Sequence, residues 1–438
     1  MNRQQGQFLI LTVMALLLLI SALGVGGIYA AQGEREATRR ATILALAQDG
    51  AQMSLAKYRH LALATARQLY QSGHPYLVNG IRPDGSRGIA CNSLDYGIAG
   101  QPNLPHQPWN EIFSLNGGQV VASLSLASGS PVSYLSSRAL AEGAQEGLSA
   151  GRQSALFASN AGFFAHAMAA RRVESQGLTV HGSLWLRAGN QPVLQGLLKI
   201  SSRYDPKELG NFAFAGEVCP VVRSTGSLPE ITISEPLWGT FGPNGQSEAW
   251  VTGPDSPHPR VPLAFIPRLT PDLLIRPNSP CFHGFEQAFS CSTRGASISW
   301  DPDEASLHLS GTVEFAGDLE IPPAQSKGNG ILIAQNLSLN GLSPSADFPF
   351  SGTGAFLARE QMVIADGLNG GVFHADRELI FSQGAEVLGH VSAPVVRGGG
   401  TIYGVPGLEH HIPAGLEAAL GPEARVLPQL LILSDVPL

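Results

Sequence analysis

Three groups of residues in this chain have types and spacings that could support chemistry. The first is Gly147-Leu148-Ser149-Ala150-Gly151, which matches the G-x-S-x-G pattern of serine hydrolases. In that pattern a hydrophobic strand leads directly into the serine, so that a sharp turn exposes its hydroxyl group. The preceding residues, LAEGAQE, do not resemble such a strand. The motif therefore does not predict a nucleophile.

A second group comprises Asp318, Asn336, Glu360 and Asp376, which recur at similar places in successive C-terminal segments. Stacked carboxylates could bind Ca²⁺ or act as a general acid and base. Asp and Asn also favour tight turns, because their side chains bond to nearby backbone groups. We favour the turn interpretation, so these residues are not assigned to a site.

The third group is His374, His390, His410 and His411. Adjacent histidines in a strand point to opposite faces, so a pair such as His410-His411 rarely binds one metal ion. Surface histidines are the expected outcome. The sequence therefore predicts no catalytic residue, no metal ligand and no cofactor.

The four cysteines contain no C-x-x-C motif, which disfavours a zinc or redox site. Cys281 and Cys291 are close in sequence, and a disulfide between them is expected if this region lies outside the cytoplasm. Cys91 and Cys219 would then be the remaining pair. The alternative is four unpaired buried thiols.

Composition indicates which elements must position these groups. Of 438 residues, 44% are hydrophobic and 14% charged, with 51 glycines and 31 prolines. This predicts a mainly β protein of many short strands joined by tight turns. The net charge of −7 argues against nucleic acid as a partner.

The exception is the run Phe8 to Ala31, which contains no charged residue. As a helix it would extend about 36 Å, enough to cross a bilayer. A cleaved signal peptide is the alternative, but this apolar core exceeds the usual length, and the candidate cleavage site Ala22-Leu23-Gly24 lies inside it. We expect a retained inner-membrane anchor (8–31) that contacts the lipid bilayer, with a leader (1–7) inside and the remainder extracytoplasmic.

The pattern of small and apolar residues continues as an amphipathic helical stalk over 32–71, at spacings near three and four. Gly24, Gly26 and Gly27 mark a place where the helix can bend or pack closely against another helix.

This N-terminal region resembles type IV pilin-like proteins, most closely the minor-pilin PilX-like group. The resemblance rests on a short leader ending in Gly6, an apolar helix, and the continuation ALAQDGAQMSLAKYR over 45–59. Gln7 follows the glycine where Phe or Met is usual, and Leu11 stands where pilins carry Glu. The resemblance implies cleavage between Gly6 and Gln7, and pilins or pilus-assembly proteins as partners.

Residues 72–110 are rich in Gly and Pro and predict a linker, followed by a β-rich middle domain over 111–295. Within it, 112–126 predicts a hairpin around Asn116-Gly117, and 155–173 a helix. Two segments resemble a bacterial pilus-associated family. They are carried by Asp205, Phe212, Ala213 and Phe214, then by Gly242-Pro243, Asn244-Gly245, Trp250 and Gly253-Pro254.

The C-terminal region, 296–438, contains an internal repeat anchored on Ala316, Ala334, Ala358 and Ala375, at spacings of 18, 24 and 17. This predicts a parallel β-helix or solenoid, with an antiparallel β-sandwich as the alternative. The pattern resembles bactofilin-like repeats. The apolar tail VLPQLLILSDVPL is expected to cap the last turn of the solenoid.

These features favour a structural or accessory component of a type IV pilus or related envelope apparatus, acting in assembly or surface adhesion rather than as an enzyme. One alternative is a membrane-anchored β-helix enzyme that acts on polysaccharide. Another is a bactofilin-like polymerising scaffold.

Overall fold

A computed structural model describes the elements that follow. The residues described are 3–71, 109–115, 118–128, 133–141, 149–159, 163–186, 194–196, 198–201, 221–224, 232–233, 250–252, 263–345, 348, 352–405, 408–421 and 429–437.

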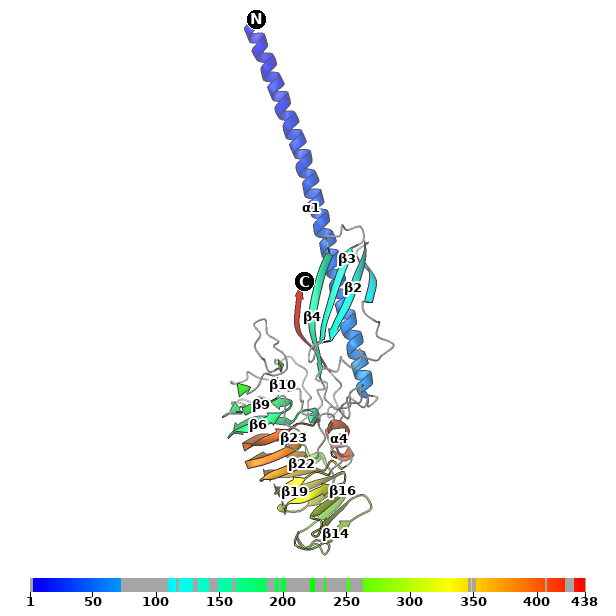
Figure 1. The fold of residues 1–438 in the computed structure, drawn as a ribbon, viewed down its shortest axis with the longest axis vertical. Coiled ribbons are helices and arrows are strands. Elements are labelled where there is room, and N and C mark those ends of the chain that lie inside the picture. The colour runs from blue at the N-terminus through cyan, green and yellow to red at the C-terminus, as the bar shows by residue number, and fades with distance from the viewer. Residues whose placement is uncertain are drawn as a thin grey trace.

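The N-terminal element is a single helix, α1 (Arg3–Gln71), of 69 residues. It projects far beyond the rest of the molecule (Figure 1). No proline lies within it, so every turn after the first can form its backbone hydrogen bond. The expected continuous helix over 8–71 is confirmed, and its division into a membrane anchor and a stalk stays a prediction.

The C-terminal half of α1 lies against a five-stranded antiparallel sheet (Figure 1). Its strands, in spatial order, are β1 (Trp109–Leu115), β2 (Gly118–Ser128), β3 (Ser133–Ala141), β4 (Ser149–Ser159) and β24 (Gln429–Pro437). β1 and β2 form the predicted hairpin, with Leu115 opposite Gly118.

The last strand, β24, differs from the expected solenoid cap. It pairs with β4, from Gln429 opposite Ser159 to Pro437 opposite Arg152. The apolar tail does form a strand, but it completes the sheet that packs on α1. A sheet edge offers unpaired backbone groups, and β4 supplies one here.

The described residues between β4 and β24 form a second body made largely of parallel strands, which we call the strand stack. Its elements before residue 263 are η1 (Phe163–Ala165), β5 (Met168–Ser175), β6 (Leu178–His181), β7 (Leu184–Leu186), β8 (Leu194–Gln195), β9 (Leu198–Ser201), β10 (Val221–Ser224), β11 (Thr232–Ile233) and β12 (Trp250–Thr252). The helix expected over 155–173 is therefore wrong: this stretch contains the end of β4, η1 and most of β5.

The later part of the stack begins with η2 (Ile266–Arg268) and β13 (Leu273–Ile275). It continues with β14 (Phe289–Ser292), β15 (Ser297–Asp301), β16 (Ser306–Phe315), β17 (Leu319–Ile321), β18 (Ala324–Lys327), β19 (Gly330–Leu339), β20 (Leu342–Ser343), β21 (Ala355–Ile364), β22 (Gly367–Ala375) and β23 (Glu378–Tyr403). η3 (Leu408–His410) and α4 (Ala414–Leu420) then lead back towards β24.

The chain enters the stack at its middle. β23, the last strand of the later part, pairs in parallel with β5, the first strand of the earlier part, from Val391 opposite Met168 to Gly398 opposite Ser175. We call this pairing the seam. The expected domain boundary between 295 and 296 therefore falls inside the strand stack. Strands from both sides of it, β5 to β9 and β16 to β23, share one sheet.

Stacking follows the predicted alanine register for three of its four anchors, whereas Ala316 is offset by one residue. Ala334 lies opposite Ala358, and Ala358 lies opposite Ala375. Ala393 extends this row across the seam to Ala170. All five are fully buried.

Apolar side chains form two cores, one on each side of the parallel strands β7, β19, β21 and β22. The inner core is contributed by residues such as Leu332, Phe356 and Phe373 from successive strands. The outer core contains Leu357 and Trp185 on the opposite face of the same strands. It is covered by residues of η1, η2, η3, α4 and their flanks, namely Phe163, Phe164, Leu263, Phe265, Ile266, Leu269, Leu408, Leu416 and Leu420.

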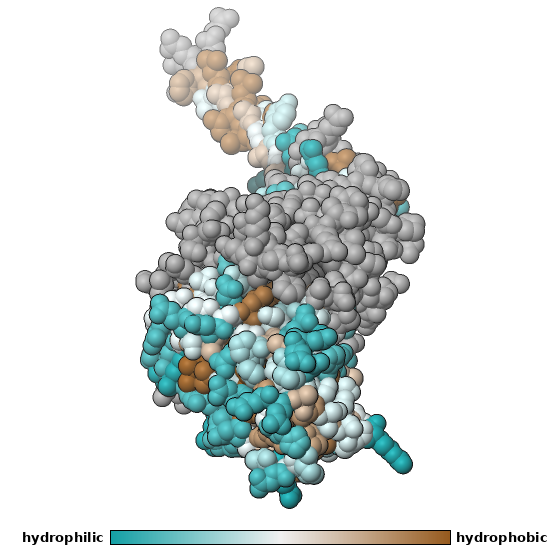
Figure 2. All heavy atoms as spheres, turned by 60° about the horizontal axis from the view of Figure 1, so that its bottom comes forward, coloured by the Kyte–Doolittle hydropathy of each residue, from teal (hydrophilic) through white to brown (hydrophobic). Residues whose placement is uncertain are grey.

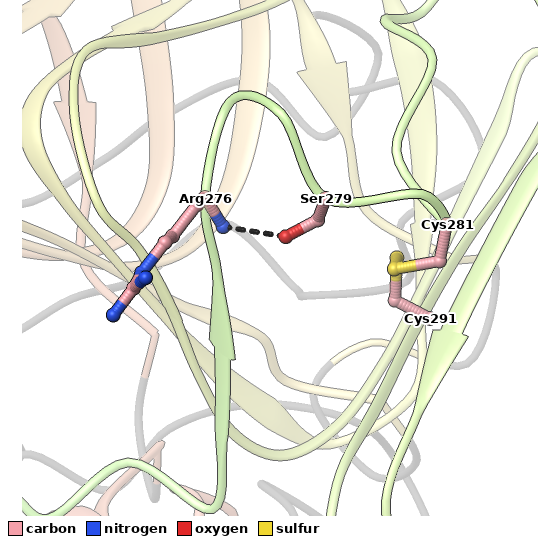
Figure 3. Close-up of a disulfide and its surroundings, with 4 residues drawn as sticks. All are labelled: Arg276, Ser279, Cys281 and Cys291. Atoms are coloured by element: carbon pink, nitrogen blue, oxygen red, sulfur yellow. Dashed lines mark hydrogen bonds between the residues drawn. A yellow bond between two sulfur atoms is a disulfide. The ribbon is translucent and has the colours of Figure 1, made fainter.

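The end of the stack farthest from the N-terminus is closed by an antiparallel set, β14, β15 and β16. Phe282 and Phe285 pack edge-on against Phe289, and Phe285 also packs against Trp300. The Cys281–Cys291 disulfide joins the covering loop to β14, beside a turn in which the Arg276 backbone N–H donates to Ser279 Oγ at 2.9 Å (Figure 3).

Candidate assembly interface

The N-terminal half of α1 exposes large apolar side chains on all of its sides. From Phe8 to Tyr29 these side chains are between 50% and 75% exposed. Consecutive helical residues differ in direction by about 100°, so a run such as Leu16 to Ile20 covers the whole circumference. The coloured part of α1 next to its grey tip is largely hydrophobic in Figure 2. Exposed apolar surfaces of this size are typical of sites that contact a membrane or another protein.

Length and composition agree with this. Within the described part of the chain, one helix is long and apolar enough to cross a membrane, and it is α1. The apolar half ends where charges begin, at Glu34 and Arg35. One turn later, Arg40 Nε lies 3.1 Å from Glu36 Oε1, with both side chains more than half exposed. This charged turn suits water rather than hydrocarbon.

The predicted packing glycines lie in the open part of the helix. A Cβ atom added to Gly24, Gly26 or Gly27 would have no neighbouring atom within 4 Å. Their role in packing stays a prediction. Gly6 and Gln7, the predicted cleavage position, lie within α1, and the structure describes only their backbone.

The C-terminal half of α1 uses one narrow stripe to contact the sheet. Ala47, Ala51, Leu55 and Tyr58 are buried at spacings of four, four and three, which places them on one face of the helix. Ala51 packs in a cluster with residues that point inward from β2 and β3, namely Val120, Ala122, Ala139 and Ala141. The same helix therefore exposes apolar side chains along its N-terminal half and buries them in a core along its C-terminal half.

Two small residues on this stripe set the helix-to-sheet distance, and sequence reasoning missed both. A Cβ atom on Gly50 would collide with the side chain of Val120. Four residues later, Ser54 Oγ shares a buried hydrogen bond of 2.5 Å with Ser137 Oγ on β3. The sequence could have indicated them, because Gly50 and Ser54 are small residues one helical turn apart and lie beside the alanines of the stripe. At the rim, Arg152 Nη1 donates to Gln52 Oε1 at 2.9 Å.

The histidines singled out from the sequence divide between two places. His374 and His390 are fully buried on neighbouring strands under the outer core, contrary to the expected surface position. His390 Nδ1–H donates to the backbone oxygen of His166 at 2.7 Å. Burial lowers the pKa of His390 to about 3. His410 and His411 lie at and just after η3.

His374 connects Asp376 to Ser392. Its Nε2–H donates to Asp376 Oδ1 at 2.9 Å, and its Nδ1 accepts from Ser392 Oγ at 2.9 Å. In a serine-hydrolase triad the serine faces Nε2 and the carboxylate faces Nδ1. Here the order is reversed, and Ser392 is fully buried.

The group acts instead as a clasp on the segment that covers the outer core. Asp376 Oδ1 also accepts hydrogen bonds from the backbone N–H groups of Phe265 and Ile266, at 3.0 and 3.4 Å. The Phe265 ring stacks on His374 with centroids 4.0 Å apart. Burial lowers the pKa of His374, while Asp376 opposes that shift. Neutral His374 fits this arrangement because both of its ring nitrogens have partners.

The four stacked polar residues do not converge on one point. Asn336 Nδ2 donates to Asp318 Oδ1 at 2.8 Å, whereas Asp376 belongs to the clasp. Within the described residues, no group of three His, Cys, Asp or Glu side chains could hold a metal ion. Of the G-x-S-x-G motif, Ser149 begins β4 and accepts hydrogen bonds from Arg138. Gly147 and Leu148 lie outside the described residues.

The cysteines expected to pair locally are joined, with Cys281 and Cys291 Cα atoms 5.3 Å apart. Cys91 and Cys219 lie outside the described residues, as do Asp205, Phe212, Ala213, Phe214 and 242–245 of the second family resemblance.

No known protein-family model matches the sequence, and no curated protein matches it. Among solved structures, the chain is similar to the crystal structure of the competence-associated pilin ComZ from Thermus thermophilus. The TM-score is 0.46 at 16% sequence identity, over 90% of this chain and 97% of that chain.

Proposed function

We propose that this protein is a pilin-like accessory subunit of a type IV pilus or a related envelope apparatus. The observation that carries the proposal is the division of α1. One half has bare apolar surface on all sides, and the other half is fixed to an antiparallel sheet through Gly50 and Ser54. A plain membrane anchor needs no such fixed junction, whereas a subunit must hold its helix at a defined angle when neighbouring helices surround it.

The apolar half would lie in the inner membrane before assembly and among the helices of neighbouring subunits afterwards. Both surroundings are free of water, so the same side chains suit both. The charged turn at Glu34 to Arg40 would mark the membrane surface. The leader 1–7, cut between Gly6 and Gln7, and the packing role of Gly24, Gly26 and Gly27 are parts of this proposal.

The strand stack supplies the second part of the proposed role. It is attached to the sheet through β4 and β24, and its disulfide-closed end is farthest from the tip of α1 (Figure 1). We infer that its parallel columns are the faces of a β-solenoid. Such a body would extend the subunit away from the membrane and present a surface for assembly or adhesion.

Photo-crosslinking in cells tests the assembly role. A photoreactive amino acid at Leu16, on the apolar half of α1, should crosslink to pilus subunits that carry their own apolar N-terminal helix. The same amino acid at Leu274, an exposed residue at the far end of the stack, should not. Crosslinking at Leu16 to lipid alone, in cells that make filaments, would show a plain anchor and overturn the proposal.

A further inference from the structure

The strand stack has one face on which polar side chains of successive strands are joined in a continuous row. We call it the ladder face. It begins with Asn336 bonded to Asp318, and Asn336 Oδ1 then accepts from the Gln361 backbone N–H at 3.2 Å. Gln361 Nε2 donates to Glu378 Oε2 at 3.1 Å.

The row then crosses the seam. Arg397 Nε lies 2.8 Å from both Glu378 Oε1 and Glu174 Oε2, so one guanidinium joins β23 to β5. Glu174 Oε1 lies 2.9 Å from Arg172 Nε, and Arg172 Nη2 donates to Gln195 Oε1 at 3.1 Å. Seven consecutive strand positions are linked, which at about 4.8 Å per strand spans roughly 29 Å.

The ladder face is open, in contrast to the face that η1, η2, η3 and α4 cover. Its strands alternate between buried core positions and accessible outward positions, as in Leu379 and Ile380. Arg397 has nearly half of its side chain exposed. Val363 and Ile380 pair with each other two residues beyond Gln361 and Glu378 of the row, and both are half-buried. The face thus combines polar groups with a short aliphatic strip.

The chemistry of the row fits a chain of neutral sugars. Carboxylate, amide and guanidinium groups together accept from and donate to hydroxyl groups. Arg397 is the most exposed of the four ion-paired side chains in the row, at 47%, so a ligand can reach its guanidinium group. The row has three carboxylates against two guanidinium groups, which gives a polyanion no electrostatic advantage.

We propose that the ladder face binds a linear, uncharged polysaccharide that lies along the stack axis. A sugar residue of an extended chain advances by about the same length as one strand spacing of ~4.8 Å, so each successive sugar would meet the polar side chain of the next strand. The aliphatic strip of Val363 and Ile380 would contact the C–H surfaces of the sugars. The proposal gives the adhesive role of the proposed function a ligand class, and rests on that function only for exposure of the stack outside the cell.

Binding of the purified full-length chain in detergent tests the ligand directly. The protein is mixed with microcrystalline cellulose, with chitin and with soluble cellohexaose, and retention or affinity is measured. The Gln361→Ala/Arg397→Ala double variant should weaken binding by about tenfold, as expected when two or three hydrogen bonds are lost. A Lys327→Ala variant removes an ion pair with Glu304 that is no part of the row and should bind normally.

A second variant avoids the seam. Ser338→Lys keeps every bond of the row, because Ser338 lies beside it and opposite Glu320, yet places a bulky charged side chain on the face. It should also weaken binding while the melting temperature stays unchanged. No retention on any neutral glycan, equal retention of all variants, or displacement by heparin or duplex DNA would overturn the proposal. Glycan binding by a chain that never enters filaments would overturn the proposed function alone.

Discussion

Ser159 at the end of β4 lies opposite Gln429 at the start of β24, although residues 160–428 separate them in the sequence. The strand stack is therefore inserted between two neighbouring strands of the sheet that packs on α1. Its two connections leave from adjacent positions, which is the geometry that lets an inserted body fold without disturbing its host. Several properties of the molecule follow from this arrangement.

Replacing residues 160–428 by Asn-Gly should leave α1 and the five-stranded sheet folded. A two-residue turn of this type joins antiparallel strands whose ends face each other. The measurement is cooperative thermal unfolding of the shortened chain in detergent, followed by circular dichroism. A chain that lacks a cooperative transition would show that the stack is needed to hold the sheet together.

A side chain at Gly50 should disrupt the junction between α1 and the sheet. Gly50→Ala raises helix propensity, but its Cβ would meet Val120, and overpacking of this kind costs about 1–3 kcal/mol. Gly33→Ala is the matched control, since a Cβ there has no neighbour within 4 Å. We expect a lower melting temperature for the first variant only. Equal melting temperatures would mean that Gly50 does not lie in close contact with Val120.

The buried histidines should make the strand stack sensitive to acid. The pKa of His390 is about 3 in the folded protein because of burial, against about 6.5 in an unfolded chain. A lowered histidine pKa means that the unfolded state takes up the proton first as pH falls. Stability should therefore decline below pH 6.5, by about 3 kcal/mol at pH 4 for this one group.

His374 adds to the same trend, because burial also lowers its pKa, and Asp376 is the charged group that faces it. The measurement is chemical unfolding at pH 7 and pH 4. His390→Phe should reduce the difference between the two, whereas His308→Gln, at an exposed position on β16, should not. An identical pH dependence in all three proteins would contradict the burial of His390.

The disulfide should stabilise the far end of the stack. Closing a loop of this length is worth about 2–3 kcal/mol, and the loop carries Phe282 and Phe285 onto the aromatic cluster. Cys281→Ser/Cys291→Ser should increase hydrogen exchange over 276–300 and leave exchange in α1 unchanged. Unaltered exchange over 276–300 would show that aromatic packing alone fixes this end.

Local patterns in the sequence predicted those features of the fold that depend on residues close together in the chain. The helix follows from an uninterrupted apolar and then amphipathic run, and the β1–β2 hairpin from Asn116-Gly117 between alternating residues. The register of Ala334, Ala358 and Ala375 followed from their spacing. Ala316 did not join the row: Glu314 pairs with Ile333, so the strands are offset by one residue at that place.

Contacts between distant segments were not predictable in this way. The tail 429–437 reads as a strand, yet nothing in its own sequence identifies β4 as its partner. The expected surface position of His374 was wrong, because the Phe265 ring that covers it comes from another part of the chain. Gly50 and Ser54 gave a weak signal, since small residues on a helix become informative only when the opposing surface is known.

The most direct test of the proposed pilus role is the mature N-terminus, determined by mass spectrometry for the membrane fraction and for filaments sheared from the cell surface. We predict a chain that begins at Gln7 and is present in the sheared filaments. A chain that begins at Met1 and stays wholly in the membrane would contradict the role of a filament subunit.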